Sequence, residues 1–322
     1  MANTVVQTRI QEVEAAVHSV IVGQEKLVNR LLIGLLCSGH VLIEGVPGLA
    51  KTLTVRALAS ALHVSFQRVQ FTPDLLPSDI IGTQIFNPRT GEFTARRGPV
   101  FANLLLADEI NRAPAKVQSA LLEAMEERQV TLGEATELLP SPFMVLATQN
   151  PIEQEGTYPL PEAQLDRFLL KVVIGYPTRA QEREVMERMG GEAPPLPAPV
   201  MEARDLTAAQ HAVHNEIFVD DRLKEYVLSL VEATRNPDQY GLKPLAALIA
   251  LGASPRASLG LLRAGKAHAY LRGSGHVTPD DIRKVAPDVL RHRISLSFEA
   301  EAEGVTSDSI IEQLIARVAV PA

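Results

Sequence analysis

The stretch 45–52, GVPGLAKT, constrains the fold of this 322-residue chain more than any other part of its sequence. A short apolar run, 40–44, precedes it and a helical pattern follows it, which is the strand–loop–helix setting of a phosphate-binding loop. The usual loop reads Gly, four free residues, Gly, Lys and then Ser or Thr, but Ala50 stands in place of the second Gly. Taken alone, the stretch is either such a loop with one substitution or a Gly-Pro turn followed by a chance Lys.

A phosphate-binding loop would work here through ordinary backbone and side-chain chemistry. Backbone N–H groups at a helix N-terminus attract an anion, and the helix dipole adds to the attraction. Gly45 and Gly48 permit the tight turn. Lys51 can reach the terminal phosphates, and Thr52 can ligate Mg²⁺ with its hydroxyl. We expect Ala50 to adopt ordinary helical dihedral angles and to begin the following helix.

Short apolar segments alternate with helical patterns in the first part of the chain, for example with the predicted helix 115–130. Nearly continuous apolar strands between helices are typical of a parallel sheet covered on both faces. The pattern therefore predicts an α/β fold with a five-stranded parallel sheet. The predicted strands are 40–44, 64–69, 102–108, 143–148 and 168–174.

Two stretches interrupt this alternation, and a third ends it. Residues 72–101, rich in Pro, Gly and Asp, predict an insertion with short β segments, and residues 129–139 predict a hairpin around Gly133. The Pro- and Gly-rich stretch 190–201 predicts a linker. We expect a nucleotide-binding α/β domain before it, at 1–189, and a small all-α lid domain after it, at 202–322, where helical patterns continue without a strand pattern.

Two adjacent carboxylates, Asp108 and Glu109, end the predicted strand 102–108. Asp108 fits the role of holding a Mg²⁺ ion and its water shell, and Glu109 fits the role of polarising an attacking water. A lone Asp-Glu pair is more often a helix cap or a solvated turn. Its position after a candidate phosphate loop favours the catalytic interpretation.

Three further polar residues follow in order. Asn150 follows the predicted strand 143–148 and could orient a water, although on its own an Asn-Pro turn is the favoured interpretation. Arg167 lies just before the last predicted strand, and Arg256 lies at the start of a helix in the second domain. An isolated Arg is usually a surface residue, but phosphoryl transfer needs cations against the charge on the γ-phosphate.

Charge and composition exclude some classes of protein. The net charge is −7 and the basic clusters are short, which does not favour a dedicated nucleic-acid binder. The single cysteine, Cys37, excludes an internal disulfide framework. The N-terminus lacks a signal-peptide pattern, and apolar runs fall short of the ~18 residues that span a bilayer. We expect a cytoplasmic protein without a membrane span.

The order of five motifs resembles one known family, the MoxR-type AAA+ ATPases of the helix-2-insert group. The resemblance runs from IVGQEKLV near the N-terminus to the helical C-terminal region, and Ala before the Lys is usual in that family. It therefore favours a phosphate-binding loop at 45–52. The motifs are GVPGLAKT (45–52), LLLADEINRAP (104–114), ATQNP (147–151), LDRF (165–168) and GASPRA (252–257).

The resemblance implies a P-loop AAA+ core that binds ATP and Mg²⁺, with Thr52 and Asp108 at the metal. Glu109 would be the catalytic base and Asn150 the first sensor. Arg167 would be an arginine finger acting on ATP of the neighbouring subunit. A second sensor arginine would report the nucleotide state to the lid. The residues implied to contact the nucleotide are Val22, Gly23, Gly45, Val46, Pro47, Gly48, Leu49, Ala50, Lys51, Thr52 and Arg256.

The resemblance also implies a ring, usually a hexamer, that remodels or matures protein partners in a chaperone-like way. Its partners would include proteins with von Willebrand factor A domains, and the insert 72–101 would face the ring pore or a partner. Three alternatives stay open from the sequence. They are a magnesium-chelatase-like motor subunit, a nucleic-acid-dependent motor and a non-enzymatic nucleotide switch.

Overall fold

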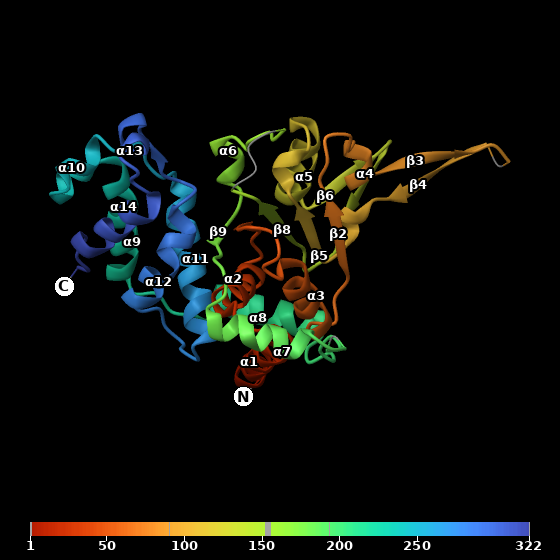
Figure 1. Cartoon of the computed structure of the whole chain (residues 1–322), viewed down its shortest axis with the longest axis horizontal. Helices are drawn as coiled ribbons and strands as arrows, with labels where there is room; N and C mark the ends of the chain where they lie inside the picture. Colours follow the sequence, from red (N-terminus) through yellow and green to blue (C-terminus); the bar gives the residue numbers. More distant parts are fainter. Residues whose placement is uncertain (1, 90, 152–155, 193, 322) are drawn as a thin grey trace.

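A computed structural model describes residues 2–89, 91–151, 156–192 and 194–321 of the chain, with side chains from residue 6 onward. Residue 90 of the predicted insert and residue 193 of the predicted linker lie outside the described residues. A helical lid, a central α/β body and a projecting hairpin follow one another along the longest axis of the molecule (Figure 1). Among the described residues, no helix combines the length and the apolar character needed to cross a membrane.

The predicted five-stranded parallel sheet is confirmed. Its strand order is β2-β5-β8-β1-β9, and every neighbouring pair is parallel. The central strands β1, β5 and β8 are almost entirely buried, as their continuous apolar sequences require. The strands are β1 (Val41–Glu44), β2 (Phe66–Gln70), β5 (Leu104–Asp108), β8 (Met144–Gln149) and β9 (Leu170–Val173).

Helices cover both faces of the sheet, because successive strand residues point to opposite sides. Val41 and Ile43 pack in one core with α1, α2 and α3, whereas Leu42 packs in a second core with α4 and α5. These helices are α1 (Ala2–Val20), α2 (Glu25–Leu36), α3 (Lys51–Ala61), α4 (Pro77–Ile81) and α5 (Ala115–Glu127).

Two antiparallel hairpins lie where the sequence interrupts the α/β alternation. The insert forms β3 (Gly82–Asn87), β4 (Glu92–Arg97) and the short η1 (Pro99–Phe101), and its hairpin projects from the body (Figure 1). The second hairpin pairs β6 (Gln129–Leu132) with β7 (Ala135–Leu138). The predicted helix 115–130 was too long, because Arg128 has a left-handed φ of 54° that ends α5 and the next residues join β6.

The lid is mainly helical, as predicted, but it is not all-α. Ile249–Leu251 (β10) pairs antiparallel with Ser295–Leu296 (β11). Strands this short show no alternation that a sequence pattern could reveal, and their pairing depends on how the lid helices pack. The lid helices are α9 (Asp221–Arg235), α11 (Pro255–Leu271), α12 (Pro279–Leu290), α13 (Phe298–Ala302) and α14 (Ser307–Arg317).

One helix after the predicted linker packs with the body. α8 (Ala203–Asn215) contacts α1 and α2 as well as α11. The lid boundary at 202 stays a prediction, and this packing favours a lid that begins after α8. The remaining elements are η2 (Ile110–Arg112), α6 (Glu162–Leu165), α7 (Arg179–Met189), η3 (Pro237–Tyr240) and α10 (Lys243–Ala246).

A buried ion cluster joins α2 of the body to α12 of the lid. The side chain of Asp288 is 1% exposed, and its carboxylate lies 2.6 Å from Arg30 Nε, 2.5 Å from Arg291 Nη1 and 3.1 Å from Lys26 Nζ. Burial alone raises the pKa of Asp288, but the charges of these cations outweigh burial and hold the pKa below its ordinary value. The cluster therefore stabilises the junction only while Asp288 is ionised.

We expect Asp288→Asn to lower the free energy of unfolding by about 3–5 kcal/mol near neutral pH, because it leaves buried cations without their counter-charge. Since the folded-state pKa is depressed, this stabilisation is present above the ordinary carboxyl pKa of about 3.9 and is lost as the pH falls below it. Urea unfolding near pH 7 and near pH 3 should therefore show a difference from the parent protein that shrinks in acid.

Asp280→Asn is the matched control, because Asp280 pairs with Arg283 on the exposed side of the same helix. We expect it to change the free energy of unfolding by less than about 1 kcal/mol. Equal losses in the two variants at neutral pH would contradict the assignment of Asp288 to the junction.

Candidate active site

The predicted phosphate loop, the two carboxylates and the strand-end amide meet at one cavity of about 490 Å³. It lies at the carboxyl ends of β1, β5 and β8, where loops of an open parallel sheet bind ligands. Gly45 and Val46 lead into it from β1. Its lining consists of Pro47, Gly48, Leu49, Ala50, Lys51, Thr52, Leu53, Arg68, Gln70, Asp108, Glu109 and Asn150.

The loop conformation depends on small residues. A Cβ atom at Gly45 would lie 2.5 Å from Ile174 Cγ1, and Gly48 has a φ of 86°. The expected helical conformation of Ala50 was wrong, since this residue has φ 55° and ψ 21° and precedes α3 as its N-cap. The left-handed region costs a non-glycine residue about 1–2 kcal/mol. Gly, which the general motif has at this position, avoids this cost, whereas Ala50 is strained.

The N-terminus of α3 fits the phosphates of a nucleotide. In the part of the chain that the structure describes, no side chain caps this helix, so its first N–H groups remain open to an anion. Lys51 Nζ donates to the carbonyl oxygen of Gly45 at 2.6 Å, which holds the ammonium against the loop. Burial lowers the pKa of Lys51, and the nearby carboxylates Asp108 and Glu109 act in the opposite direction.

Asp108 is held by two residues that the sequence did not single out. Arg68 of β2 donates from Nε and Nη2 to Asp108 Oδ2, at 3.0 and 2.6 Å. The buried Thr148 donates its hydroxyl to Asp108 Oδ1 at 2.6 Å and accepts from the backbone N–H of Glu109 at 2.8 Å. Both carboxylate oxygens of Asp108 therefore have fixed partners, and its side chain has one orientation.

Glu109 is positioned in a similar way. Its φ of 57° is left-handed, which turns the chain sharply at the end of β5. Glu109 Oε2 accepts from Gln70 Nε2 at 2.7 Å and lies 3.0 Å from Arg112 Nε. Glu109 lines the cavity together with Asp108 and the phosphate loop.

These residues fit Mg²⁺ as well as the phosphates of a nucleotide. The carboxylate of Asp108 and the hydroxyl of Thr52 are hard oxygen donors, which Mg²⁺ prefers, and both belong to the lining of the same cavity. Phosphate oxygens and water would supply the remaining ligands.

Val22 and Gly23, which the family resemblance implies as nucleotide contacts, lie outside the lining of this cavity. They join α1 to α2, and a Cβ at Gly23 would lie 2.9 Å from the side chain of Gln181 on α7. Gly45 in turn contacts Ile174, shortly before α7. The α1–α2 junction and the phosphate loop therefore adjoin the same segment, and the assignment of Val22 and Gly23 to the nucleotide stays a prediction.

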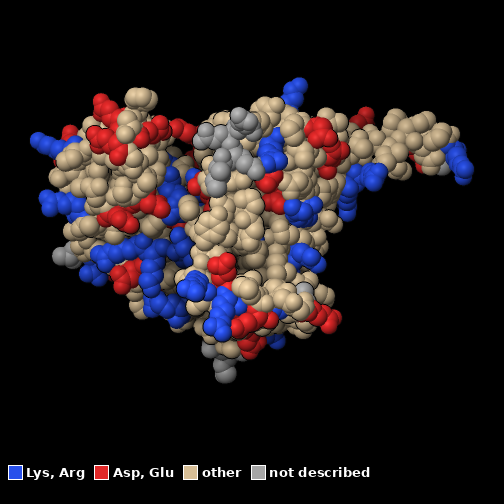
Figure 2. Space-filling view, in the orientation of Figure 1, with Lys and Arg blue, Asp and Glu red and all other residues tan. Residues whose placement is uncertain are grey.

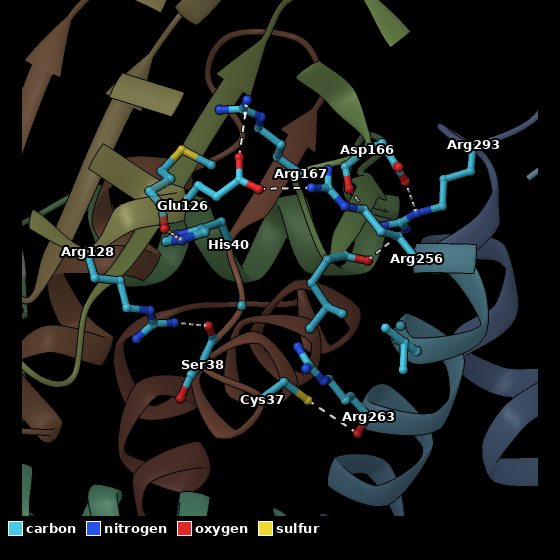
Figure 3. A pocket seen from close by; sticks show the side chains of 15 residues that line it. Cys37, Ser38, His40, Glu126, Arg128, Asp166, Arg167, Arg256, Arg263 and Arg293 are labelled. Atoms are coloured by element: carbon cyan, nitrogen blue, oxygen red, sulfur yellow. Dashed lines mark hydrogen bonds and ion pairs between the residues drawn. The ribbon is translucent and has the colours of Figure 1, made fainter. Parts of the chain in front are cut away.

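Arg167 and Arg256 lie together at a second cavity, of about 290 Å³, between the body and the lid (Figure 3). Glu126 of α5 binds both: its Oε2 is 3.1 Å from Arg167 Nη2 and its Oε1 is 2.9 Å from Arg256 Nη2. The family resemblance implies that Arg256 contacts a nucleotide, and this assignment stays a prediction. The structure places Arg256 with Arg167, outside the lining of the phosphate-loop cavity.

Two of the residues that the sequence interpretation missed had a recognisable signal. Arg68 and Gln70 alternate along β2, so they share one face of a strand that neighbours β5 in the sheet. The polar end of that strand could have been matched to the Asp-Glu pair. Thr148 and Glu126 have no such signal, because their contacts depend on strand order and on lid packing.

Comparisons with known proteins agree with this geometry. Residues 40–170 match the model of the "ATPase family associated with various cellular activities (AAA)", and residues 245–314 match an AAA lid domain. The chain is 52% identical to Chaperone MoxR1 of Mycobacterium tuberculosis over 95% of its own length and 80% of the relative's. It is 35% identical to Protein MoxR of Paracoccus denitrificans, with 98% and 97% coverage.

A crystal structure of a candidate ATPase from Cytophaga hutchinsonii superimposes on the whole chain. The TM-score is 0.95 at 48% sequence identity, with coverage of 100% of this chain and 97% of the other. The α/β body, the lid and their connection are therefore those of a protein already seen by crystallography.

Because Ala50 is left-handed, we expect Ala50→Gly to raise the free energy of unfolding by about 0.5–1 kcal/mol. Gly releases the strain of about 1–2 kcal/mol and loses about 0.5–1 kcal/mol through its greater freedom in the unfolded chain. Urea unfolding measures the change. Ala59→Gly, inside the following helix α3, is the control and should destabilise by about 1 kcal/mol or more. Destabilisation of similar size at both positions would contradict the left-handed assignment.

Proposed function

This chain belongs to the MoxR-type AAA+ ATPases, a family of chaperone-like ATPases, and on that premise we propose that it acts as a hexameric ring that remodels or matures protein partners. One observation carries the proposal. The candidate catalytic residues divide between two separate places on the protomer, with Lys51 and Glu109 at one cavity and Arg167 and Arg256 at another. A second copy of the chain would bring the two sets together.

The phosphate-loop cavity would hold the nucleotide. Lys51 and the first N–H groups of α3 bind its phosphates, and Thr52 and Asp108 hold the metal ion. Bound Mg²⁺ neutralises phosphate charge. Glu109, already fixed by its hydrogen bond from Gln70, accepts a proton from the attacking water. Asn150 at the end of β8 orients that water.

The second cavity would serve the neighbouring subunit. The side chains of Arg167 and Arg256 are both partly exposed, and they share the single carboxylate of Glu126, which can balance only one of their two positive charges. In the ring they would turn from Glu126 to the γ-phosphate of the neighbour's ATP. An arginine supplied in this way accelerates phosphoryl transfer by about 10³–10⁵ in related systems. Hydrolysis would then depend on assembly.

The projecting hairpin suits contact with a protein partner. Ile85, Phe86 and Phe93 are exposed on it, and the two phenylalanine rings pack 5.1 Å apart. Figure 2 shows that the hairpin is mostly uncharged on the visible face. Exposed apolar groups of this kind mark interaction sites. We propose proteins with von Willebrand factor A domains as the partners, from the family resemblance.

We expect Lys51→Ala to abolish nucleotide binding and Glu109→Gln to retain it while lowering kcat by about 10²–10⁴-fold, the contribution of a general base. Equilibrium binding of a fluorescent ATP analogue and phosphate release measure the two effects. Lys116→Ala, an exposed lysine of α5, should leave both unchanged. Normal turnover by Glu109→Gln would remove Glu109 from the catalytic role.

We expect Arg167→Ala to bind ATP normally and to lose turnover by about 10³-fold or more. When it is mixed with Glu109→Gln, activity should return in part, because the intact arginine of one subunit meets the intact carboxylate of another. Phosphate release from defined mixtures, with assembly checked by light scattering, measures the recovery. Assembled mixtures without recovery would show that Arg167 does not act on a neighbour.

A further inference from the structure

Arg293 of the lid binds the turn that contains Arg167. Arg293 follows α12, and its side chain is only 3% exposed. Its Nε donates to Asp166 Oδ1 at 2.7 Å. Its Nη2 donates to the carbonyl oxygens of Phe168, at 2.6 Å, and of Asp166, at 3.2 Å. Its Nη1 donates to the carbonyl oxygens of Leu169, at 3.2 Å, and of Val289.

These contacts use all five N–H donors of the Arg293 guanidinium, and four of them go to residues 166–169. A buried, fully paired guanidinium has one geometry, and the turn between α6 and β9 is therefore fixed on both sides of Arg167. Holding the lid to the body does not require this arrangement, because Arg291 and Asp288 already join the lid to α2 and β9.

The same carboxylate connects this turn to the helix of Arg256. Asp166 Oδ2 accepts from the hydroxyl of Ser254 at 2.9 Å, and Ser254 is the N-cap of α11, accepting from the backbone N–H of Arg256. Figure 3 shows Asp166 beside Arg293, with Arg167 and Arg256 directed toward Glu126. Arg293, Asp166 and Ser254 thus form one hydrogen-bonded group that holds the backbone beside two arginines, Arg167 of the body and Arg256 of the lid.

We propose that Arg293, through Asp166 and Ser254, is a positioning residue that sets the spacing of Arg167 and Arg256 for a shared phosphate on a neighbouring subunit. This inference rests on the proposed action of these arginines in trans. Long arginine side chains lose about 2 kcal/mol of rotamer freedom when they are ordered. A rigid base under both of them reduces the disorder that must be removed in the transition state.

The test uses Arg293→Lys in the full-length assembled protein. Lys keeps a cation beside Asp166 but loses the planar fork that binds the carbonyl oxygens of 166–169. We expect kcat to fall by about 10–100-fold, as for a small misplacement of a catalytic group, with the KM for ATP and nucleotide binding unchanged. Arg291→Lys is the matched control, since it alters a buried lid–body arginine that does not touch this turn, and its kcat should stay within about twofold.

Mixing provides a readout that a general folding defect would not give. Arg293→Lys subunits keep their own phosphate loop and Glu109, so mixtures with Glu109→Gln should recover activity as mixtures with Arg167→Ala do. The proposal is wrong if Arg293→Lys loses no more kcat than Arg291→Lys, or if its mixtures fail to recover while the Arg167→Ala mixtures succeed. If neither mixture recovers, the action in trans fails and the proposal falls with it.

A second pair of variants decides the question if Arg293→Lys does not fold. Ser254→Ala removes the bond to Asp166 and one N-cap of a lid helix, whereas Ser297→Ala removes only a comparable N-cap, that of α13. Both should cost about 1 kcal/mol of stability. Only Ser254→Ala should lower kcat, and equal kcat values in the two variants would overturn the proposal.

Discussion

Parallel pairing of β1 with β8 and of β8 with β5 is the constraint on which the candidate active site depends. In this register Glu44 lies opposite Gln149, and the end of β2 lies opposite Asp108. Strands that run in the same direction end at the same edge, so the phosphate loop, the Asp-Glu pair and Asn150 meet although they are far apart in the sequence. The apolar strand sequences that bury both faces of the sheet hold this edge in place.

The placement of Arg167 and Arg256 depends on the junction between the lid and the body. Its buried charges are arranged so that each has a partner: Asp288 is surrounded by cations, and Arg293 has an acceptor for every N–H. Buried ion pairs contribute little net stability when they are compared with apolar packing, but removal of one partner is strongly destabilising because it leaves a buried charge uncompensated. In this protein the contacts of Arg293 and Asp166 fix the turn of Arg167 against the helix of Arg256, which connects the lid to the proposed chemistry.

Much of the fold could be predicted because it rests on local patterns. The five strands and the main lid helices follow from apolar periodicity, and their observed ends differ from the predicted ends by a few residues. The helix 115–130 was extended too far because Arg128 takes a left-handed conformation that its residue type does not signal. The pair β10–β11 was missed because two very short segments pair only after the lid helices have packed.

The sequence by itself determined the phosphate loop, the Asp-Glu pair and the family, because each lies in a continuous motif whose residue types carry the chemistry. Only the tertiary structure decided that Ala50 is left-handed, and that Arg256 lies beside Arg167 at a cavity separate from that of Lys51. It also decided the partners of Asp108 and the hydrogen bonds from Arg293 to residues 166–169. These contacts join residues from separate strands or domains, and their geometry follows from strand order and lid packing, which no local pattern encodes.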